Sequence, residues 1–285
     1  MCVWVWYLRV LEFLGGEMID LQKMICVAAD AGNFRLLDSL RAGHRNIMSS
    51  CGVDEDGCTP LHHALQGLMF SNMAGFANTS KTSDRVDYVN TITTLLAMGL
   101  DASARDGYGQ TPLMIVCSHK ESDVDIHTSI VNLLLRHGAN VNDTEICGPL
   151  SYGNLGMTAL HYAVIYGFCS TARKLILLGA DIEALSNHGQ TPLFMLAIYY
   201  VEHFISEKEC DDDMDTMLLL LLAGARTDCT NAKGETLMDA LDALDLDLSP
   251  DFVLEDMYKM RGWKLLNSCV RIQSDLLRET RASGN

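Results

Sequence analysis

Apolar blocks rich in leucine, isoleucine and methionine recur along the chain, and each block ends at a glycine. Apolar runs of this length that close on glycine are typical of helices, because glycine adopts the left-handed conformation that ends a helix. The blocks occupy residues 34–43, 91–99, 130–138, 172–179 and 217–224. Four of the closing residues, which we expect in the left-handed conformation, are Gly99, Gly138, Gly179 and Gly224.

A second pattern, Gly-x-Thr followed by apolar residues, alternates with these blocks. It begins at Gly57, Gly109, Gly156, Gly189 and Gly234. Threonine is a favourable helix N-cap, and proline follows it in three copies, at the first helical position where a missing N–H costs nothing. The pattern predicts that a helix starts after each of four threonines: Thr59, Thr111, Thr158 and Thr191.

The two patterns together define an internal repeat. Gly156 and Gly189 are 33 residues apart, and the segments that begin there read GMTALHYAV and GQTPLFMLA. This period, with Thr-Pro-Leu-His and a Leu-Leu-x-x-Gly-Ala helix end, resembles the ankyrin repeat over about residues 20–245. The resemblance implies an all-α solenoid of about five to six helix-turn-helix pairs with hairpin-like fingers, whose core forms by stacking of neighbouring repeats.

The resemblance also divides the chain. We expect an N-terminal extension or capping segment over residues 1–19, the repeat domain over 20–245 and capping helices over 246–285. Three of the glycine spacings exceed 33 residues, which predicts inserted loops near residues 67–88, 118–128, 143–155 and 199–215. The first copy, residues 24–43, lacks Thr-Pro-Leu-His, as suits an N-terminal cap.

The net charge and the cysteines limit which classes of partner and which cellular location are favoured. The formal net charge is −16 and no basic cluster occurs, so a nucleic-acid partner is disfavoured. The ten cysteines form no Cys-x-x-Cys pair or zinc-ligand spacing, which favours a reducing, cytoplasmic or otherwise intracellular location without a metal or other cofactor. The apolar N-terminus is too short and too charged for a membrane span.

Two adjacent histidines, His62 and His63, are the first candidates for chemistry. His62 occupies the last position of Thr-Pro-Leu-His, as His161 does in a later copy, and the resemblance implies a structural imidazole that hydrogen-bonds locally and to the neighbouring loop. Met114 fills the same position in another copy and can do no acid–base chemistry. His63 aligns with Tyr162 and other apolar residues, which predicts a partly buried, neutral ring, with a ligand or pH-sensitive role as the alternative.

Enzyme motifs for phosphate binding, serine hydrolysis, zinc proteolysis and kinase activity are absent, so we expect no enzyme. The resemblance instead implies that finger tips and first helices line a concave surface that binds a partner protein, with no small-molecule substrate. Aromatic anchors with a polar rim are typical of interface hot spots. The candidate partner-binding residues are Tyr108, Gln110, His119, Leu155, Met157, Ile165, Tyr166, Asn187, His188, Ile198, Tyr199 and Lys233.

Three alternatives stay open. Residues such as Tyr166 and Tyr199 could pack under the inserted loops of their own chain instead of facing a partner. The C-terminal segment WKLLNSCVRIQSDLL has a faint likeness to a SOCS-box start, so the chain could be an adaptor that recruits a second complex such as a ubiquitin ligase. An enzyme that carries the repeats as a module is the third, although no remaining segment has the size of a catalytic domain.

Overall fold

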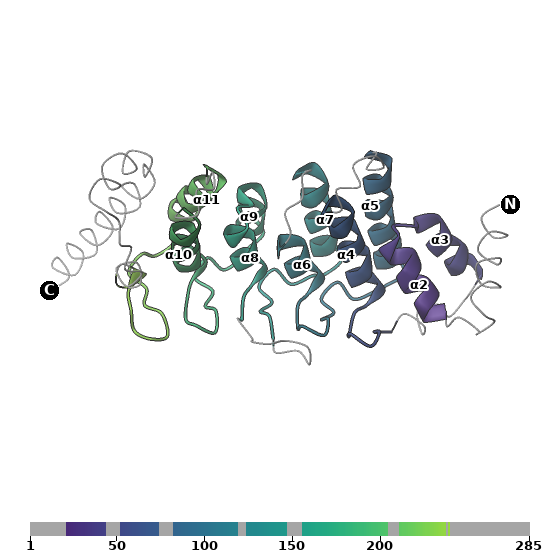
Figure 1. Cartoon of the computed structure of the whole chain (residues 1–285), viewed down its shortest axis with the longest axis horizontal. Coiled ribbons are helices and arrows are strands. Elements are labelled where there is room, and N and C mark those ends of the chain that lie inside the picture. The colour runs from purple at the N-terminus through teal and green to yellow at the C-terminus, as the bar shows by residue number, and fades with distance from the viewer. Residues whose placement is uncertain are drawn as a thin grey trace. The chain divides into compact units, whose positions relative to one another are not determined.

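The computed structural model describes helices and their connections (Figure 1). Its described residues are 21–43, 52–73, 82–118, 124–146, 156–204, 211–237 and 239. The chain divides into two compact units, Met1–Ile115 with Glu121–Ala139 and Val116–Lys120 with Asn140–Asn285. The predicted segments 1–19 and 246–285 lie outside the described residues.

The first unit is a set of antiparallel helices. Its helices are α2 (Leu21–Asp30), α3 (Phe34–Gly43), α4 (Pro60–Met73), α5 (Thr82–Ala97) and α7 (Val124–Arg136), and α6 (Pro112–Ser118) is shared with the second unit. Helix α2 packs on α4, α3 packs on α5, and α5 packs in turn on α7. Leu37, Leu61 and Leu95 are fully buried between these helices, so the core of the unit forms by packing of one helix pair on the next.

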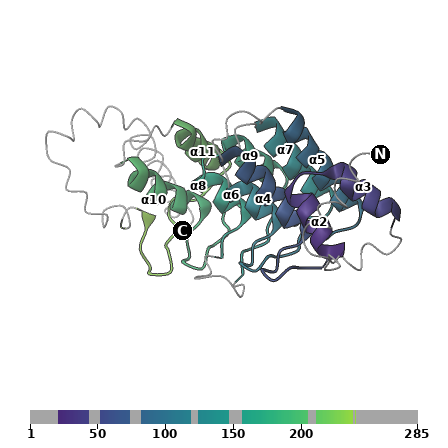
Figure 2. The same cartoon turned by 45° about the vertical axis from the view of Figure 1, so that its right-hand side comes forward.

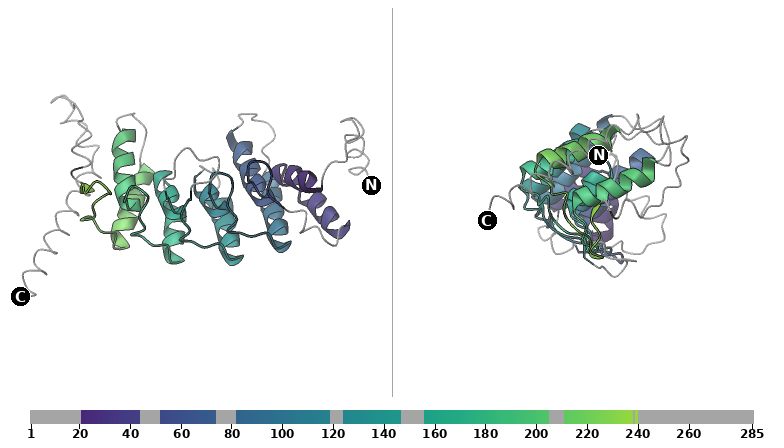
Figure 3. Two further views of the ribbon diagram at one scale, coloured as in Figure 1. Left: turned by 90° about the horizontal axis from the view of Figure 1, so that it is seen from below. Right: turned by 90° about the vertical axis from the view of Figure 1, so that its left-hand side faces the viewer.

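The second unit repeats the arrangement. It contains α8 (Ala159–Ile165), α9 (Cys169–Leu177), α10 (Pro192–Phe204) and α11 (Asp211–Leu222). Helices α10 and α11 lie side by side in Figure 3, and each also packs on the preceding pair, α10 on α8 and α11 on α9. Leu160, Leu175 and Leu220 are fully buried in these contacts.

Hairpin-like fingers connect the helix pairs, and within each unit they project to one side of the helices (Figure 2). The described residues contain no strand, only two isolated antiparallel bridges, Thr144 with Thr158 and Thr230 with Thr236. The predicted closing glycines are all left-handed, with φ values of 89° at Gly99, 92° at Gly138, 91° at Gly179 and 95° at Gly224. Each apolar block therefore ends where the sequence pattern places its end.

The degenerate first copy forms the helix pair α2–α3, which packs closely against α4 and α5. A Cβ added to Gly67 of α4 would collide with the carbonyl oxygen of Asp30 at the end of α2. The hydroxyl of Tyr88 in α5 donates a hydrogen bond to the same oxygen at 2.8 Å. Gly67 and Tyr88 thus fix the approach of the first helix pair to the second.

The predicted inserted loops are shorter than the spacing between the Gly-x-Thr glycines suggested. Helix α4 runs on to Met73 and α5 begins at Thr82, so both enter the segment 67–88. In the same way α7 starts at Val124, while α10 extends to Phe204 and α11 starts at Asp211. The extra residues lengthen helices as well as loops. The remainder of these insertions, including residues 74–81 and 147–155, lies outside the described residues.

Candidate functional site

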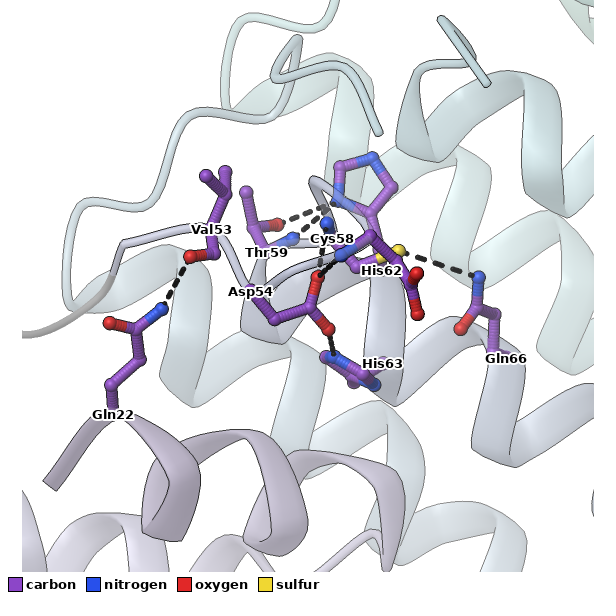
Figure 4. A network of polar contacts seen from close by, with 9 residues as sticks. Gln22, Val53, Asp54, Cys58, Thr59, His62, His63 and Gln66 are labelled. Atoms are coloured by element: carbon purple, nitrogen blue, oxygen red, sulfur yellow. Dashed lines mark hydrogen bonds and ion pairs between the residues drawn. The ribbon is translucent and has the colours of Figure 1, made fainter. Parts of the chain in front are cut away.

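The imidazole of His62 caps the start of its own helix. Its Nδ1 lies 2.8 Å from the hydroxyl of Thr59 and accepts the backbone N–H of Thr59 at 3.1 Å (Figure 4). His161 makes the same pair of contacts with Thr158, at 2.9 and 3.1 Å, within a capping box. Both rings are fully buried. The predicted local contact is present at both histidines, whereas the buried Nε2 of His62 makes no hydrogen bond to the neighbouring finger.

His161 also links one repeat to the next. Its Nε2 lies 3.1 Å from the carbonyl oxygen of Gln190, which belongs to the following finger. Burial lowers the pKa of His161 to about 4, against a weaker opposing effect of the Gln190 hydrogen bond. Burial likewise lowers the pKa of His62. Both rings are therefore neutral near pH 7 and shielded from any substrate.

Other side chains fill the same position and perform the same task. The backbone N–H of Thr111 points to the sulfur of Met114 at 3.5 Å. In the last copy, a carboxylate oxygen of Asp239 accepts both the N–H and the hydroxyl of Thr236, at 2.9 and 2.7 Å. An acceptor for threonine occupies this position in these copies, whereas Phe194 fills it after Thr191 and offers none, so the position does not require a proton-transfer group.

His63 differs from the predicted packing residue. Its Nε2 lies 2.7 Å from Oδ2 of Asp54 in the preceding finger, and both side chains are partly exposed, at 23 and 28%. The ring is partly buried, as predicted, but the finger also supplies a carboxylate directly beside it, which the sequence analysis did not predict. Oδ1 of Asp54 accepts the backbone N–H groups of Asp56 and Cys58, at 3.0 and 2.8 Å. His63 thus supports a turn rather than forming a reactive pair.

The same turn recurs before Gly57, Gly109, Gly189 and Gly234, while the residues that would form it before Gly156 lie outside the described residues. In each, an oxygen-bearing side chain three residues before the glycine accepts the N–H groups two and four residues further on. The acceptors are Asp54, Asp106, Ser186 and Asn231. Sequence reasoning missed them, although their constant position before Gly-x-Thr was a usable signal.

Burial raises the pKa of Asp54, but hydrogen bonds from the Cys58 N–H and from His63 outweigh that effect, so its pKa lies below 3.8. The Cys58 thiol behind it is buried, and burial with the charges of Asp54 and Asp106 raises its pKa to about 11. Burial and Glu183 raise the pKa of Cys229 to about 11 as well. Neither thiol is poised as a nucleophile, since the thiolate is the reactive form.

The predicted partner-binding residues fall into four groups. Tyr108, Tyr166, Asn187, His188 and Lys233 are exposed, and Gln110, Ile165, Ile198 and Tyr199 are half-buried. Met157 is only 3% exposed, so its side chain belongs to the interior, and its carbonyl oxygen accepts the N–H of Glu145 inside the finger. His119 and Leu155 lie outside the described residues.

The second unit places the apolar candidates at equivalent repeat positions of two helices, at the end of α8 and in the middle of α10. Ile165 and Tyr166 end α8, and Ile198 and Tyr199 hold the equivalent positions in α10, which packs on α8. Tyr166 is 43% exposed and stacks on Phe168, with ring centroids 6.5 Å apart and planes at 23°. We call Ile165, Tyr166, Phe168, Ile198 and Tyr199 the aromatic patch. Tyr108 and Gln110 belong to the first unit.

The described residues hold no group of three or more His, Cys, Asp or Glu side chains that could bind a metal ion. Within the same part of the chain, no helix is both long and apolar enough to cross a membrane. The described surface also carries exposed aromatic and polar side chains, among them Tyr108, Tyr166 and His188.

Comparison with known proteins identifies the repeat. Residues 83–186 match the family model for ankyrin repeats in three copies. The chain is 24% identical over 163 residues to ankyrin repeat protein OPG189 of Variola virus, and the aligned region covers 57% of this chain and 25% of that protein. It is 29% identical over 211 residues to the B-cell lymphoma 3 protein homolog of Mus musculus, and that alignment covers 67% of this chain and 42% of the relative. The chain thus spans less than half of these curated relatives.

Among solved structures, an ankyrin repeat domain from Acinetobacter baumannii AYE matches with a TM-score of 0.57 and 19% identity, covering 88% of this chain and 97% of that one. The predicted resemblance to ankyrin-repeat proteins is therefore confirmed. The all-α ankyrin-repeat fold predicted from the sequence is confirmed as well.

Proposed function

We propose that this chain, with its ankyrin-repeat fold, is a non-catalytic interaction module that binds a partner protein through the aromatic patch of its second unit. Matches to ankyrin-repeat proteins support a protein-interaction role in general. The buried, neutral caps His62 and His161 and the raised pKa values of Cys58 and Cys229 argue against catalysis at the described positions.

The single observation that carries the proposal is the exposed Tyr166 ring. A rigid aromatic side chain contributes a large contact area at little cost in conformational entropy, which is why tyrosine is enriched in interface hot spots. Stacking on Phe168 holds the ring in place before a partner arrives. Ile165 on α8 and the equivalent Ile198 and Tyr199 on α10 are half-buried, and the two helices pack on each other, so a bound segment would find apolar side chains on two adjacent helices.

Polar groups complete such a surface. Asn187 and His188 are exposed at the finger tip that precedes α10, where they can satisfy polar groups of a bound segment. Their backbone is fixed by the Ser186 hydroxyl, which accepts the N–H groups of His188 and Gln190 at 3.3 and 3.2 Å. We propose that these tips set orientation and specificity while the aromatic patch supplies affinity.

The proposed cellular location of the protein is based on its cysteines. Cys26, Cys58, Cys117, Cys169 and Cys229 are all free thiols in the described part of the chain. Free thiols persist in reducing compartments, which supports a cytoplasmic or otherwise intracellular site of action. The net charge of −16 makes nucleic acid an unfavourable partner.

The test is affinity purification from the source cell, first with the wild-type chain and then with Tyr166→Ala/Tyr199→Ala. Leu177→Ala is the matched control, because Leu177 is 77% exposed at the end of α9 and outside the aromatic patch. We expect a specific partner to be recovered by the wild type and the control and lost by the double variant. Equal recovery by all three would refute this assignment of the binding surface.

A further inference from the structure

The two helices that carry most of the aromatic patch have no basic residue. Neither α8 nor α10 contains Lys or Arg. The described part of the second unit holds four basic residues, which lie on other elements: Arg173, Lys174, Arg226 and Lys233. The first two belong to α9, and the guanidinium group of Arg226 already lies 3.0 Å from the carboxylate of Asp228. The helices of the patch therefore bring no positive charge to its surface.

The chain becomes strongly acidic directly after the patch. Residues 200–215 contain seven Asp or Glu residues and one Lys. Four of the seven are Asp residues among the first five positions of α11, which read DDDMD. The helix dipole stabilises acidic residues at a helix N-terminus, so this negative segment is compatible with the start of a helix.

The acidic start of α11 lies at the same end of its helix pair as Tyr199. Tyr199 precedes the end of α10 at Phe204 by five residues, about 7 Å along the helix axis. The short connection makes α11 run antiparallel to α10, and the two helices pack on each other. Thr216 and Met217 are buried, so α11 is packed from its second turn onward. The Asp-rich turn therefore adjoins the Tyr199 end of the patch.

The α8 end of the patch offers an aromatic face. Tyr166 is 43% exposed while it stacks on Phe168, with ring centroids 6.5 Å apart. The face of an aromatic ring is electronegative and attracts ammonium and guanidinium groups. Half-buried Ile165 and Ile198 suit an apolar stem. An apolar stem with a cationic head is the structure of a Lys or Arg side chain.

We propose that the segment bound by the aromatic patch is basic, with apolar anchors flanked by Lys or Arg. This inference rests on the proposed function, because it names the class of partner for that same surface. The stems of the basic side chains lie over Ile165 and Ile198, and their charged heads face the Tyr166 ring and the start of α11. Complementary charge speeds association and disfavours acidic competitors, which the Asp-rich turn repels.

The probe is a display library of random peptides of about 12 residues, long enough to cross two adjacent helices. Such a library contains basic, neutral and acidic sequences alike, and it is selected against the full chain. We expect enriched peptides that combine Lys or Arg with aromatic or aliphatic residues. A synthetic copy of the enriched peptide should bind about tenfold more weakly in about 500 mM than in about 50 mM NaCl, and more weakly still with Gln at its basic positions.

A charge-neutralised chain tests the contribution of α11. The variant combines Asp211→Asn, Asp212→Asn, Asp213→Asn and Asp215→Asn, and Asn remains compatible with a helix start. The matched control removes the same charge from exposed positions of the first unit through Asp38→Asn, Glu55→Gln, Asp56→Asn and Asp101→Asn. At low salt the α11 variant should bind the peptide at least about fivefold more weakly, and the control less than about twofold. Equal losses in both chains would overturn the assignment to α11.

Tyr166→Ala/Tyr199→Ala separates this inference from the proposed function. Enriched peptides that need the two tyrosines but are neutral or acidic would overturn the basic partner and leave the binding surface in place. Peptides that bind the double variant as well as the wild type, or a selection that enriches none, would refute the surface and this inference with it. Tighter peptide binding by Lys264→Gln/Arg271→Gln would assign the patch to basic residues of the chain's own C-terminal segment, against a separate partner.

Discussion

At the scale of single residues, the repeat motif is a set of hydrogen-bond acceptors for backbone and side-chain groups at helix starts and finger turns. The Nδ1 of His62 and His161, the sulfur of Met114 and the carboxylate of Asp239 all face the threonine that starts a helix. Chemically different side chains therefore do one structural job. A histidine at this position therefore indicates a helix cap and is not evidence of a catalytic site.

His161 should make stability depend on pH. Its pKa is about 4 when folded, against an ordinary value of 6.5, so the unfolded chain binds more protons between these values. Stability from the neutral ring is present above pH 6.5 and is lost as the pH falls towards 4, by about 3 kcal/mol in total.

The variant His161→Met tests this sign, because Met114 shows that methionine fits the position. We expect it to cost about 1–2 kcal/mol at pH 7.5, from the lost hydrogen bonds, and less at pH 5. Urea unfolding at both values measures the difference. A cost that grows on acidification would contradict the assignment of a buried neutral imidazole.

Asp54 should be replaceable by asparagine but not by alanine. Its Oδ1 satisfies two amides of the finger turn, and Asn231 performs the same task in the last described finger. Asp54→Ala should cost about 1–2 kcal/mol and speed hydrogen exchange at Asp56 and Cys58, whereas Asp54→Asn should retain most of the protection. Similar exchange rates in the two variants would show that the acceptor does not hold the turn.

At the scale of elements, the helices follow from Gly-x-Thr starts and glycine ends, and both ends were predictable because each has a local backbone cause. The finger turns could have been predicted from Asp54, Asp106, Ser186 and Asn231 but were not. The pairing of His63 with Asp54 could not have been predicted, because it joins a helix residue to a residue of the preceding finger. The lengths of α4 and α10 were also missed, because apolar residues continue into the insertions without a stop signal.

Gly67 tests the packing of α2 on α4. Alanine normally favours a helix over glycine, yet here its methyl group would strike the Asp30 carbonyl oxygen. Gly67→Ala should therefore destabilise the protein by about 1–3 kcal/mol, whereas the neighbouring control Gln66→Ala should change stability little. Thermal unfolding compares them. A stabilised Gly67→Ala would mean that the first helix pair is not held against α4 in this way.

At the scale of the whole molecule, the chain consists of two compact units built from one repeat, and each presents different surfaces. The first unit carries the His63–Asp54 finger, and the second carries the aromatic patch. The exposure of the candidate binding residues was only partly predictable from the sequence. Exposure depends on neighbouring segments, which is why Tyr166 lies on the surface while Met157, two residues into the repeat, lies in the core.

The central claim is that the aromatic patch binds a partner protein, and a direct titration of the purified partner tests it. Tyr166→Ala/Tyr199→Ala should weaken the Kd at least about tenfold, since hot-spot aromatics contribute more than about 1 kcal/mol each. Leu177→Ala should bind like the wild type, and circular dichroism should show all three chains folded. An unchanged Kd for the folded double variant would contradict the account.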